Sequence, residues 1–371
     1  MELVLSPEQE ELRRSTRRFL EDKSPSTAVR ALMVDADGYD PAVWKQMAEQ
    51  LGLHGLTIPE EFGGSGYGFV ELAIVLEEMG RVLLPSPYFS TVAMAAQAIL
   101  DSHDAQASKE LLPGIADGST IATLALTEDD GRWDVDAVST SATFSGDKWM
   151  LNGVKSYVVD GHLADLVIVV ARTSRGLSLF AVDGSEPGLA KAPLATLDQT
   201  RKLARLTLDD VEGRLVGVEG GATENLERTL DKIAVALAAE QVGGAQRVLE
   251  MALDYAQVRH QFGRPIGSFQ VIKHQAADMF LQIGSARSAA FYAAWAAQDE
   301  SDELPVVASI AKAYCSEAYF YAAAENIQIH GGIGFTWEHD AHLYFKRAKA
   351  TQLFLGDGVY HRERLAQRIG I

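Results

Sequence analysis

The period of the hydrophobic pattern changes twice along this chain, and this order of segments constrains its fold most strongly. Residues 1–118 carry mainly helical patterns. Residues 119–222 hold short β-rich runs, such as LVIVVART and LSLFAVD, which are separated by Gly, Asp and Asn as strands are. Residues 223–371 are rich in Ala, and their apolar spacing is typical of helices. The sequence therefore predicts a helical domain, a β-sheet or barrel domain, and a bundle of helices.

Local signals sharpen this prediction. Ser6 followed by Pro7 offers an N-cap and a proline at the first helical position. Asn152-Gly153, between KWML and VKSYVV, is a strong signal for a β-hairpin. Long helices are expected over 223–257, 268–298, 303–330 and 336–352.

Composition excludes several classes of protein. The 371 residues carry a formal net charge of −18, which disfavours non-specific binding to nucleic acid or to anionic membranes. No apolar run is long enough for a transmembrane helix. The start, MELVLSPEQEELRRS, lacks the basic and apolar regions of a signal peptide. A cytoplasmic enzyme fits these features.

The chain has one cysteine, Cys315, so an intramolecular disulfide and a cysteine-based zinc cluster are both excluded. Its flanks, KAYCSEAYF, are typical of a helix interior. We expect an inert thiol in the core.

Two loop motifs have residue types suited to a phosphate-bearing cofactor. RHQFGRPIGSFQ at 259–270 combines a guanidinium donor, a flat apolar ring and an amide. QIHGGIGFTWEHD at 328–340 brings three glycines after a helix, which lets backbone N–H groups approach a ligand closely. An ordinary helix–helix loop and an ordinary helix end are the alternative interpretations of the two motifs.

Together, at this spacing and in this domain order, the motifs resemble the acyl-CoA dehydrogenase family over essentially the whole chain. The best matches are R-x-x-F-G-x-x-x-x-x-x-Q at 259–270 and Q-I-x-G-G-x-G-F at 328–335. LALTE at 124–128 and NGVKSYVVDG at 152–161 match more loosely. The resemblance implies a mostly α fold: an N-terminal helical domain, a middle β-barrel domain and a C-terminal four-helix bundle.

The resemblance also implies FAD, bound between the β-domain and the bundle and completed by a neighbouring subunit. Arg259 and Phe262 would meet its diphosphate and adenine side across a dimer interface. The remaining residues implied to line FAD are Gln270, Gln328, Gly331, Gly332, Leu126, Thr127, Glu128, Tyr157 and Val159.

Three positions depart from the family pattern. Val159 stands where a hydroxyl is common, so only its backbone N–H is available to flavin N5. Trp133 replaces a serine common near the arm of CoA, and Ala234 stands near a position where an arginine is common. The contacts to CoA therefore do not carry over residue by residue.

The general base of the family reaction is also missing from its usual places. A carboxylate removes the α proton of the acyl thioester. Most members carry it in a loop near the C-terminus, where this chain has Leu355, and a minority carry it on a helix at the position of Ile233. Neither side chain accepts a proton.

Glu240 is the first candidate to replace this base. It follows Ile233 by seven residues, which is about two helical turns, so both lie on one helix face. Gly243-Gly244 would leave room beside the carboxylate, and an apolar setting would raise its pKa toward neutrality. A structural pair with a buried arginine, with the glycines allowing close helix packing, is the alternative. Asp357 is a second candidate, and a subunit without a base is the third.

The sequence thus predicts an FAD-dependent acyl-CoA dehydrogenase that forms a trans-2-enoyl thioester and passes electrons to an electron-transfer flavoprotein. We expect a homodimer or homotetramer. A partner subunit that completes an FAD site in a hetero-oligomer, and a flavin oxidase or monooxygenase of the same fold, are the alternatives.

Overall fold

The structure is a computed structural model that describes residues 5–371. It forms two compact units. The helical unit holds the chain up to Arg30, Phe69–Leu84 and Ala234–Ile371, and the mixed unit holds Ala31–Gly68 and Pro85–Ile233. These units do not follow the three predicted ranges, whose boundaries stay a prediction. Part of the N-terminal stretch expected to carry no signal peptide lies outside the described residues.

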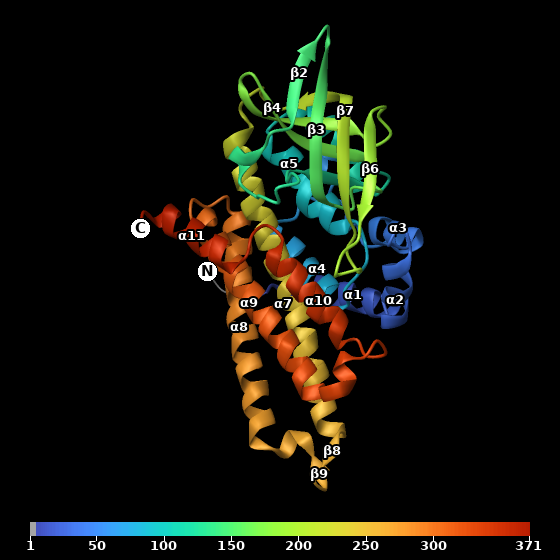
Figure 1. Ribbon diagram of the computed structural model, residues 1–371, viewed down its shortest axis with the longest axis vertical. Coiled ribbons are helices and arrows are strands. Elements are labelled where there is room, and N and C mark those ends of the chain that lie inside the picture. Colours follow the sequence, from blue (N-terminus) through green and yellow to red (C-terminus); the bar gives the residue numbers. More distant parts are fainter. Residues whose placement is uncertain (1–4) are drawn as a thin grey trace. The chain divides into compact units, whose positions relative to one another are not determined.

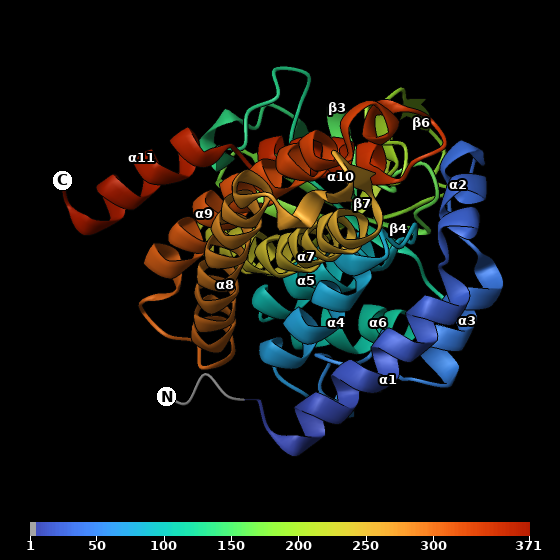
Figure 2. The ribbon, with the colours of Figure 1, turned by 90° about the horizontal axis from the view of Figure 1, so that it is seen from below.

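The helical unit is built from long helices that pack against one another. The α8 and α9 helices pack along each other, and α10 and α11 also pack on α9 (Figures 1 and 2). Ser6 caps α1, where its side chain accepts a bond from the N–H of Gln9 while the Gln9 side chain accepts one from Ser6. The elements are α1 (Pro7–Lys23), α4 (Phe69–Arg81), the later part of α7 (Ala222–Val258), β8 (His260–Gln261), β9 (Arg264–Pro265), η4 (Ile266–Ser268), α8 (Gln270–Gln298), α9 (Leu304–His330), η5 (Gly331–Phe335), α10 (Ala341–Leu353) and α11 (Gly358–Ile369). The four long helices predicted from periodicity are confirmed within a few residues at each end, except that α10 begins at Ala341.

The α4 and α7 helices approach so closely that only glycine fits at their crossing. A Cβ atom on Gly243 would overlap the carbonyl oxygen of Glu77, and one on Gly80 would overlap that of Glu240. A Cβ atom on Gly244 would lie 2.5 Å from the hydroxyl of Tyr319 on α9. The Gly-Gly pair of α7 therefore serves packing against both α4 and α9.

The mixed unit combines short helices with a seven-stranded sheet. Its strands are β1 (Ala122–Ala125), β2 (Ser141–Ser145), β3 (Lys148–Val159), β4 (Leu166–Thr173), β5 (Gly176–Asp183), β6 (Leu189–Leu194) and β7 (Leu203–Val216). Its helices are α2 (Ser26–Val34), which begins in the helical unit, α3 (Pro41–Glu49), η1 (Glu60–Phe62), η2 (Phe89–Ala95), α5 (Ala96–Asp101), α6 (Ala105–Ala116), η3 (Val135–Ala137) and the start of α7.

The predicted barrel is confirmed only in part. The strands follow the order β1-β4-β2-β3-β7-β5, β6 pairs with β7, and β4 also pairs with β5, so five strands form a circuit. However, β2 and β4 are joined by the single pair Ser141↔Arg172, while β4 and β5 pair over eight residues. One seam of the barrel is therefore nearly open. Inside the barrel, one apolar core includes Leu151, Val169, Phe180 and Leu206.

The hairpin predicted at Asn152-Gly153 is wrong. Both residues lie inside β3, and the hairpin between β2 and β3 turns after the pair Ser145↔Lys148. Gly153 instead occupies an irregularity in the pairing of β3 with β7, where a Cβ atom would lie 2.7 Å from the Thr140 hydroxyl. Glycine in a strand often marks such a bulge, and a dipeptide signal does not distinguish it from a turn.

Among the described residues, no helix combines the length and apolarity needed to cross a membrane.

The crossing of α4 and α7 yields a stability prediction. Gly243→Ala places a methyl group on the Glu77 carbonyl, and overpacking of this kind costs about 1–3 kcal/mol. The matched control is Gly284→Ala on α8, where nothing lies within 4 Å of the added carbon. Gly284→Ala should stabilise the chain by about 0.5–1 kcal/mol because alanine favours helix. Equal unfolding midpoints for the two variants in a urea titration would contradict the close crossing.

Candidate functional site

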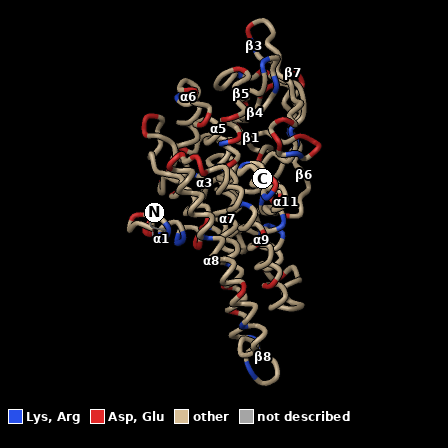
Figure 3. The backbone as a smooth tube through the Cα atoms, turned by 90° about the vertical axis from the view of Figure 1, so that its left-hand side faces the viewer, with Lys and Arg blue, Asp and Glu red and all other residues tan. Residues whose placement is uncertain are grey.

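The motif at 259–270 lies at a free end of the helical unit. The chain leaves α7, forms the small β8–β9 hairpin and enters α8 through η4. Phe262 is 92% exposed and has a positive φ of 51°, while Arg264 stacks on the Phe269 ring at 4.2 Å. Arg259 and Gln270 are exposed as well. Figure 3 shows basic residues at the tip labelled β8, so the hairpin presents positive charge together with the exposed Phe262 ring.

The glycine motif ends α9. Gly331 has a positive φ of 63°, and neither it nor Gly332 has an atom within 4 Å of where a Cβ would stand. Both glycines and Gln328 are exposed. The ring of His330 stacks on Tyr255 of α7, with centroids 4.3 Å apart, and the Tyr255 carbonyl accepts the N–H of Arg259 at 2.9 Å. This stack brings the two cofactor motifs together at the same end of α7.

The β-domain motifs are organised by a buried lysine. Lys155 of β3 is fully buried, and its Nζ donates to the Leu126 carbonyl and to Glu128 Oε1, each at 2.9 Å. Burial lowers the pKa of Lys155 to about 8, against the opposing charge of Glu128. Glu128 also accepts the N–H groups of Ser139 and Thr140, at 3.0 and 2.8 Å. Its carboxylate therefore fixes the loop after β1.

The electrostatics of Glu128 follow from these partners. Burial acts to raise the pKa of its carboxyl, but the Ser139 bond and the charge of Lys155 outweigh it, and the pKa falls to about 2. Glu128 is therefore ionised at any physiological pH, and its charge is already matched within the chain.

The residues near Glu128 present groups that suit a ligand. Thr127 is 4% exposed, and its hydroxyl oxygen has no partner among the described residues. Tyr157 lies in a second irregularity of β3, has a positive φ of 58° and is 42% exposed, as a bulge that redirects a side chain would produce. Val159 is fully buried, and its carbonyl accepts the Thr123 hydroxyl at 2.7 Å. An orphaned hydroxyl beside a redirected aromatic ring fits a polar, planar group such as a flavin.

Glu240, the first candidate base, has a charged partner. Arg347 of α10 donates from Nη1 to Glu240 Oε1 at 2.9 Å, and the two side chains are 3% and 5% exposed. The expectation of an uncharged setting for Glu240 is therefore wrong. The expected free space is wrong too, because α4 and Tyr319 occupy the surroundings of Gly243-Gly244. The sequence identified the buried acid but not its arginine, which lies 107 positions along the chain.

Asp357, the second candidate, begins α11. Its carboxylate accepts the N–H groups of Val359 and Tyr360, at 3.0 and 2.9 Å, as an N-cap does. A cap of this kind gives Asp357 a structural task. Ile233, at the alternative family position, is fully buried.

The loop before Asp357 is held by two buried bases that sequence reasoning missed. His361 Nε2 lies 2.9 Å from the Leu355 carbonyl, and Lys312 Nζ donates to the carbonyls of Gly356 and Gln352 at 3.0 and 3.2 Å. Leu355 itself is buried and has a positive φ of 63°. The side chain at the usual position of the base is thus fixed in the interior by bonds to its own backbone.

Lys312 also reaches α7. Its Nζ donates to Ser316 Oγ at 3.0 Å, and the Gln241 amide donates to the same oxygen at 3.0 Å. Burial lowers the pKa of Lys312 to about 7, with Cys315 and Asp357 as the opposing neighbours. A lysine inside the Ala-rich run of α9 was the available signal for this network. Cys315 is buried, as predicted, and burial raises its pKa to about 12.

The match to known families settles the class of the chain. Three family models cover it: "Acyl-CoA dehydrogenase, N-terminal domain" at residues 6–119, "middle domain" at 123–211 and "C-terminal domain" at 222–370. The chain belongs to the acyl-CoA dehydrogenase family, whose members are flavoprotein oxidoreductases that act on CH–CH bonds.

Similar proteins agree with this assignment. "Acyl-CoA dehydrogenase IpdE2" of Mycobacterium tuberculosis is 40% identical over 94% of this chain and 93% of its own length. A solved variant of the "Tcur3481-Tcur3483 steroid ACAD" is 34% identical, covers 98% of both chains and has a TM-score of 0.90. The "ChsE4-ChsE5 complex from Mycobacterium tuberculosis" is 26% identical, covers 100% of this chain and 99% of the other, and has a TM-score of 0.91.

The buried lysine yields a pH prediction. The folded pKa of Lys312 is about 7, whereas an unfolded lysine has a pKa of about 10.4, so between these values the unfolded chain binds more protons. The free energy of unfolding should therefore rise with pH over this window, by up to about 1.4 kcal/mol per pH unit for each such lysine, and Lys312→Met should remove the contribution of Lys312 while that of Lys155 remains.

Urea unfolding from pH 7 to 10 measures this difference. The matched control is Lys45→Met, which removes an exposed lysine and should give a curve parallel to the wild type. A parallel curve for Lys312→Met as well would refute the lowered pKa.

Proposed function

We propose that this chain is a subunit of an FAD-dependent enzyme that converts an acyl-CoA thioester to a trans-2-enoyl-CoA. Family membership and the names of its relatives support the general reaction. FAD, when bound, accepts the β hydrogen of the substrate as a hydride at its N5 atom. The residues of the chain have to bind this cofactor, hold the thioester beside it and exclude water.

The exposed hairpin is the main support for the way in which FAD is bound. Arg259 and Phe262 are both exposed, and the Phe262 ring contacts only the edge of Phe269 in the same loop, with centroids 6.1 Å apart, among the ring contacts of the described residues. We assign them to the diphosphate and adenine side of an FAD held largely by a second chain. Further FAD contacts that we propose are Gln270, Gln328, Gly331 and Gly332 in the helical unit, and Leu126, Thr127, Glu128, Tyr157 and Val159 in the mixed unit.

The source of the base follows from one observation, the Glu240–Arg347 pair. A carboxylate bonded to a buried guanidinium at 2.9 Å has its negative charge stabilised, which makes it a weak base. Leu355 takes no proton, and Asp357 caps a helix. We therefore propose that the chain works within a hetero-oligomer. In this assembly, a carboxylate in the active site of a second, related chain removes the α proton.

Two solved relatives support this assembly, because each is named as a pair, Tcur3481-Tcur3483 and ChsE4-ChsE5. In this arrangement the chain lends its Arg259 hairpin to the FAD of its partner. A homodimer or homotetramer that uses Glu240 or Asp357 is the alternative that the experiments below separate. An electron-transfer flavoprotein as acceptor and a cytoplasmic location complete the proposal.

The first experiment tests cofactor binding. Arg259→Ala should lower FAD affinity about 10- to 150-fold, because a charge-assisted hydrogen bond is worth about 1.5–3 kcal/mol. The matched control is Arg14→Ala. It removes an exposed arginine that lies on α1, outside the hairpin, and it should leave FAD bound. Fluorescence titration of the assembled protein with FAD measures both. Wild-type affinity in Arg259→Ala would refute the role of the hairpin.

The second experiment asks whether Glu240 is a base or a structural ion. Glu240→Gln removes the carboxylate that pairs with buried Arg347 and should cost about 3–5 kcal/mol of stability. The double variant Glu240→Gln/Arg347→Gln removes both charges and should recover most of that loss. Asp357→Asn tests the cap in parallel.

The decisive readout is flavin bleaching by acyl-CoA in the chain purified alone and in the chain produced with its related partner. We expect bleaching only in the mixed assembly, and we expect it to survive in the double variant and in Asp357→Asn. A chain that bleaches flavin as a homo-oligomer and loses about 10²–10⁴-fold in rate in the folded double variant would make Glu240 the base after all. A comparable loss in Asp357→Asn would identify the loop carboxylate.

A further inference from the structure

Three histidines lie where the chain passes from α9 through the glycine loop (residues 331–340) into α10, and each ring contacts another aromatic ring. His330 stacks on Tyr255 of α7, with ring centroids 4.3 Å apart. The ring of His339 in turn lies 4.3 Å from that of His330. His342 meets the edge of Trp337 at 4.8 Å. The end of α9, the glycine loop and α7 are therefore joined through imidazole rings.

Hydrogen bonds fix which nitrogens of two of these rings carry a proton. His330 Nδ1 lies 2.8 Å from the Asn326 carbonyl, which can only accept, so this nitrogen is protonated. His339 Nδ1 accepts the backbone N–H of Ala341 at 3.1 Å, so this nitrogen carries no proton. Only a neutral His339 ring makes the bond to Ala341.

This bond gives His339 the role of a helix cap. Ala341 is the first residue of α10, and Asp340 before it makes no side-chain cap bond. The first N–H groups of a helix have no partner within the helix, so an acceptor supplied from outside stabilises them. A proton on His339 Nδ1 would set two donors against each other, and the positive end of the α10 dipole would oppose the added charge.

The charges around His339 do not favour its protonated form. The Asp340 carboxylate accepts two bonds from Arg30, at 3.0 and 2.7 Å, so its charge is already matched. Burial lowers the pKa of the His339 ring, the charge of Asp340 opposes this effect, and the charge of Arg30 adds to it. The other titratable groups of this region are Tyr255, His330, the exposed Glu338, His342 and Lys346, whose ammonium lies 4.1 Å from the Trp337 ring.

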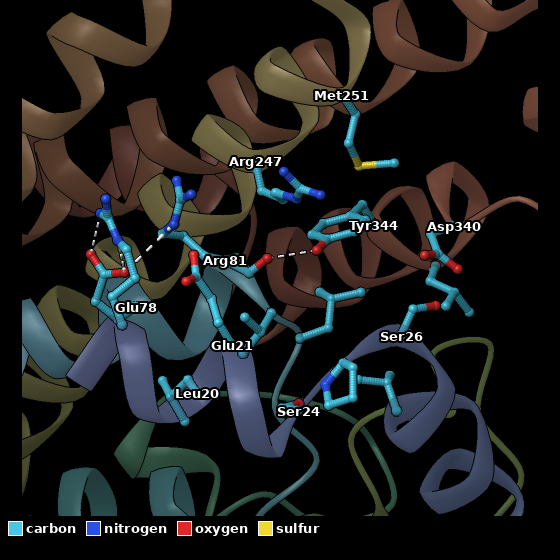
Figure 4. A pocket seen from close by; sticks show the side chains of 16 residues that line it. Leu20, Glu21, Ser24, Ser26, Glu78, Arg81, Arg247, Met251, Asp340 and Tyr344 are labelled. Carbon is cyan, nitrogen blue, oxygen red and sulfur yellow. Dashed lines mark hydrogen bonds and ion pairs between the residues drawn. The ribbon is translucent and has the colours of Figure 1, made fainter. Parts of the chain in front are cut away.

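The anchors of α10 itself do not depend on the charge of His339. Arg30 also donates to the Trp337 carbonyl at 2.7 Å. The Tyr344 hydroxyl donates to the Arg81 carbonyl at 2.6 Å, a bond that Figure 4 shows together with Asp340 near the start of α10. Loss of the His339 cap would therefore leave α10 in place and loosen the part of the glycine loop in front of Trp337.

We propose that His339 is a positioning residue for the glycine motif, and that it holds this motif in its FAD-binding form only while its ring is neutral. The proposal rests on the proposed function, because it takes Gly331 and Gly332 as FAD contacts. The ordered loop holds the pKa of His339 below the ordinary value of about 6.5, whereas the loosened loop restores that value, so acid favours the loosened loop. FAD affinity should be full above about pH 7 and fall as the pH decreases through about 6.5.

Fluorescence titration of the assembled protein with FAD at pH 8.0 and at pH 5.5 tests this dependence. The wild type should bind FAD about 2- to 30-fold more weakly at pH 5.5, the range expected for a lost helix cap. His339→Asn keeps an acceptor for the N–H two residues on but does not titrate, so it should bind FAD equally at both pH values. His339→Phe keeps a ring without an acceptor, so it should bind weakly at both.

The matched control is His103→Asn, which replaces an exposed histidine of the mixed unit and should keep the wild-type response to pH. Asparagine tolerates the positive φ of 54° at this position. His342→Gln should keep the response as well. A response that persists in His339→Asn, or that disappears in His342→Gln, would overturn the proposal. Thermal unfolding of each variant checks that it remains folded.

Hydrogen exchange of the protein without FAD separates this proposal from the proposed function. Between pH 8.0 and pH 5.5, the protection factors of the backbone N–H groups in residues 331–343 should fall about 2- to 30-fold in the wild type and stay constant in His339→Asn. This result without any FAD binding would support the role of His339 in the loop and refute Gly331 and Gly332 as FAD contacts. Constant protection in the wild type would overturn the role of His339, whatever the affinity for FAD.

Discussion

The close crossing of α4 and α7 is the constraint on which the helical unit depends. Gly80 lies against the backbone of Glu240, and Gly243 lies against that of Glu77, so the two helices touch without side chains between them. This contact decides which residues of α7 are enclosed. It leaves Glu240 without access to water, and a buried carboxylate needs a partner. Arg347 of α10 provides it.

The same helices bury further acids, each with arginines from another helix. Glu77 accepts from Arg287 of α8 at 2.8 Å, and Glu78 accepts from Arg17 of α1 at 2.7 Å. Such pairs contribute little net stability, but removing one partner is costly because the other charge stays buried. They therefore fix the register of α1, α4 and α8 more than they strengthen the fold.

The candidate catalytic region follows the same logic. The position where the family usually carries its base holds Leu355, and the chain fixes this loop with Lys312 and His361 instead of exposing it. The cofactor motifs, in contrast, are presented outward at the end of α7. A subunit with an outward cofactor hairpin and an inward loop suits an assembly in which neighbouring chains share the site.

The sequence by itself determined the class of the protein, because local patterns carry that information. Periodicity located α7, α8 and α9, and the motifs at 259–270 and 328–335 indicated the family that the comparisons then showed. The β-rich segment was also evident, but its closure was not, because pairing between β2 and β4 depends on register and not on composition.

Only the tertiary structure decided what the unusual residues do. Glu240 stood out in the sequence as a buried acid. However, a catalytic base and a structural ion would have the same local pattern of residues around them. Arg347 lies 107 positions along the chain from Glu240, and Lys312 lies 44 positions from the Gly356 carbonyl that it binds, so no periodicity links these partners. Asn152-Gly153 was a turn by its local preference, yet long pairing with β7 kept it within β3. Partners distant in sequence settle such cases, since charge and hydrogen bonding act through space.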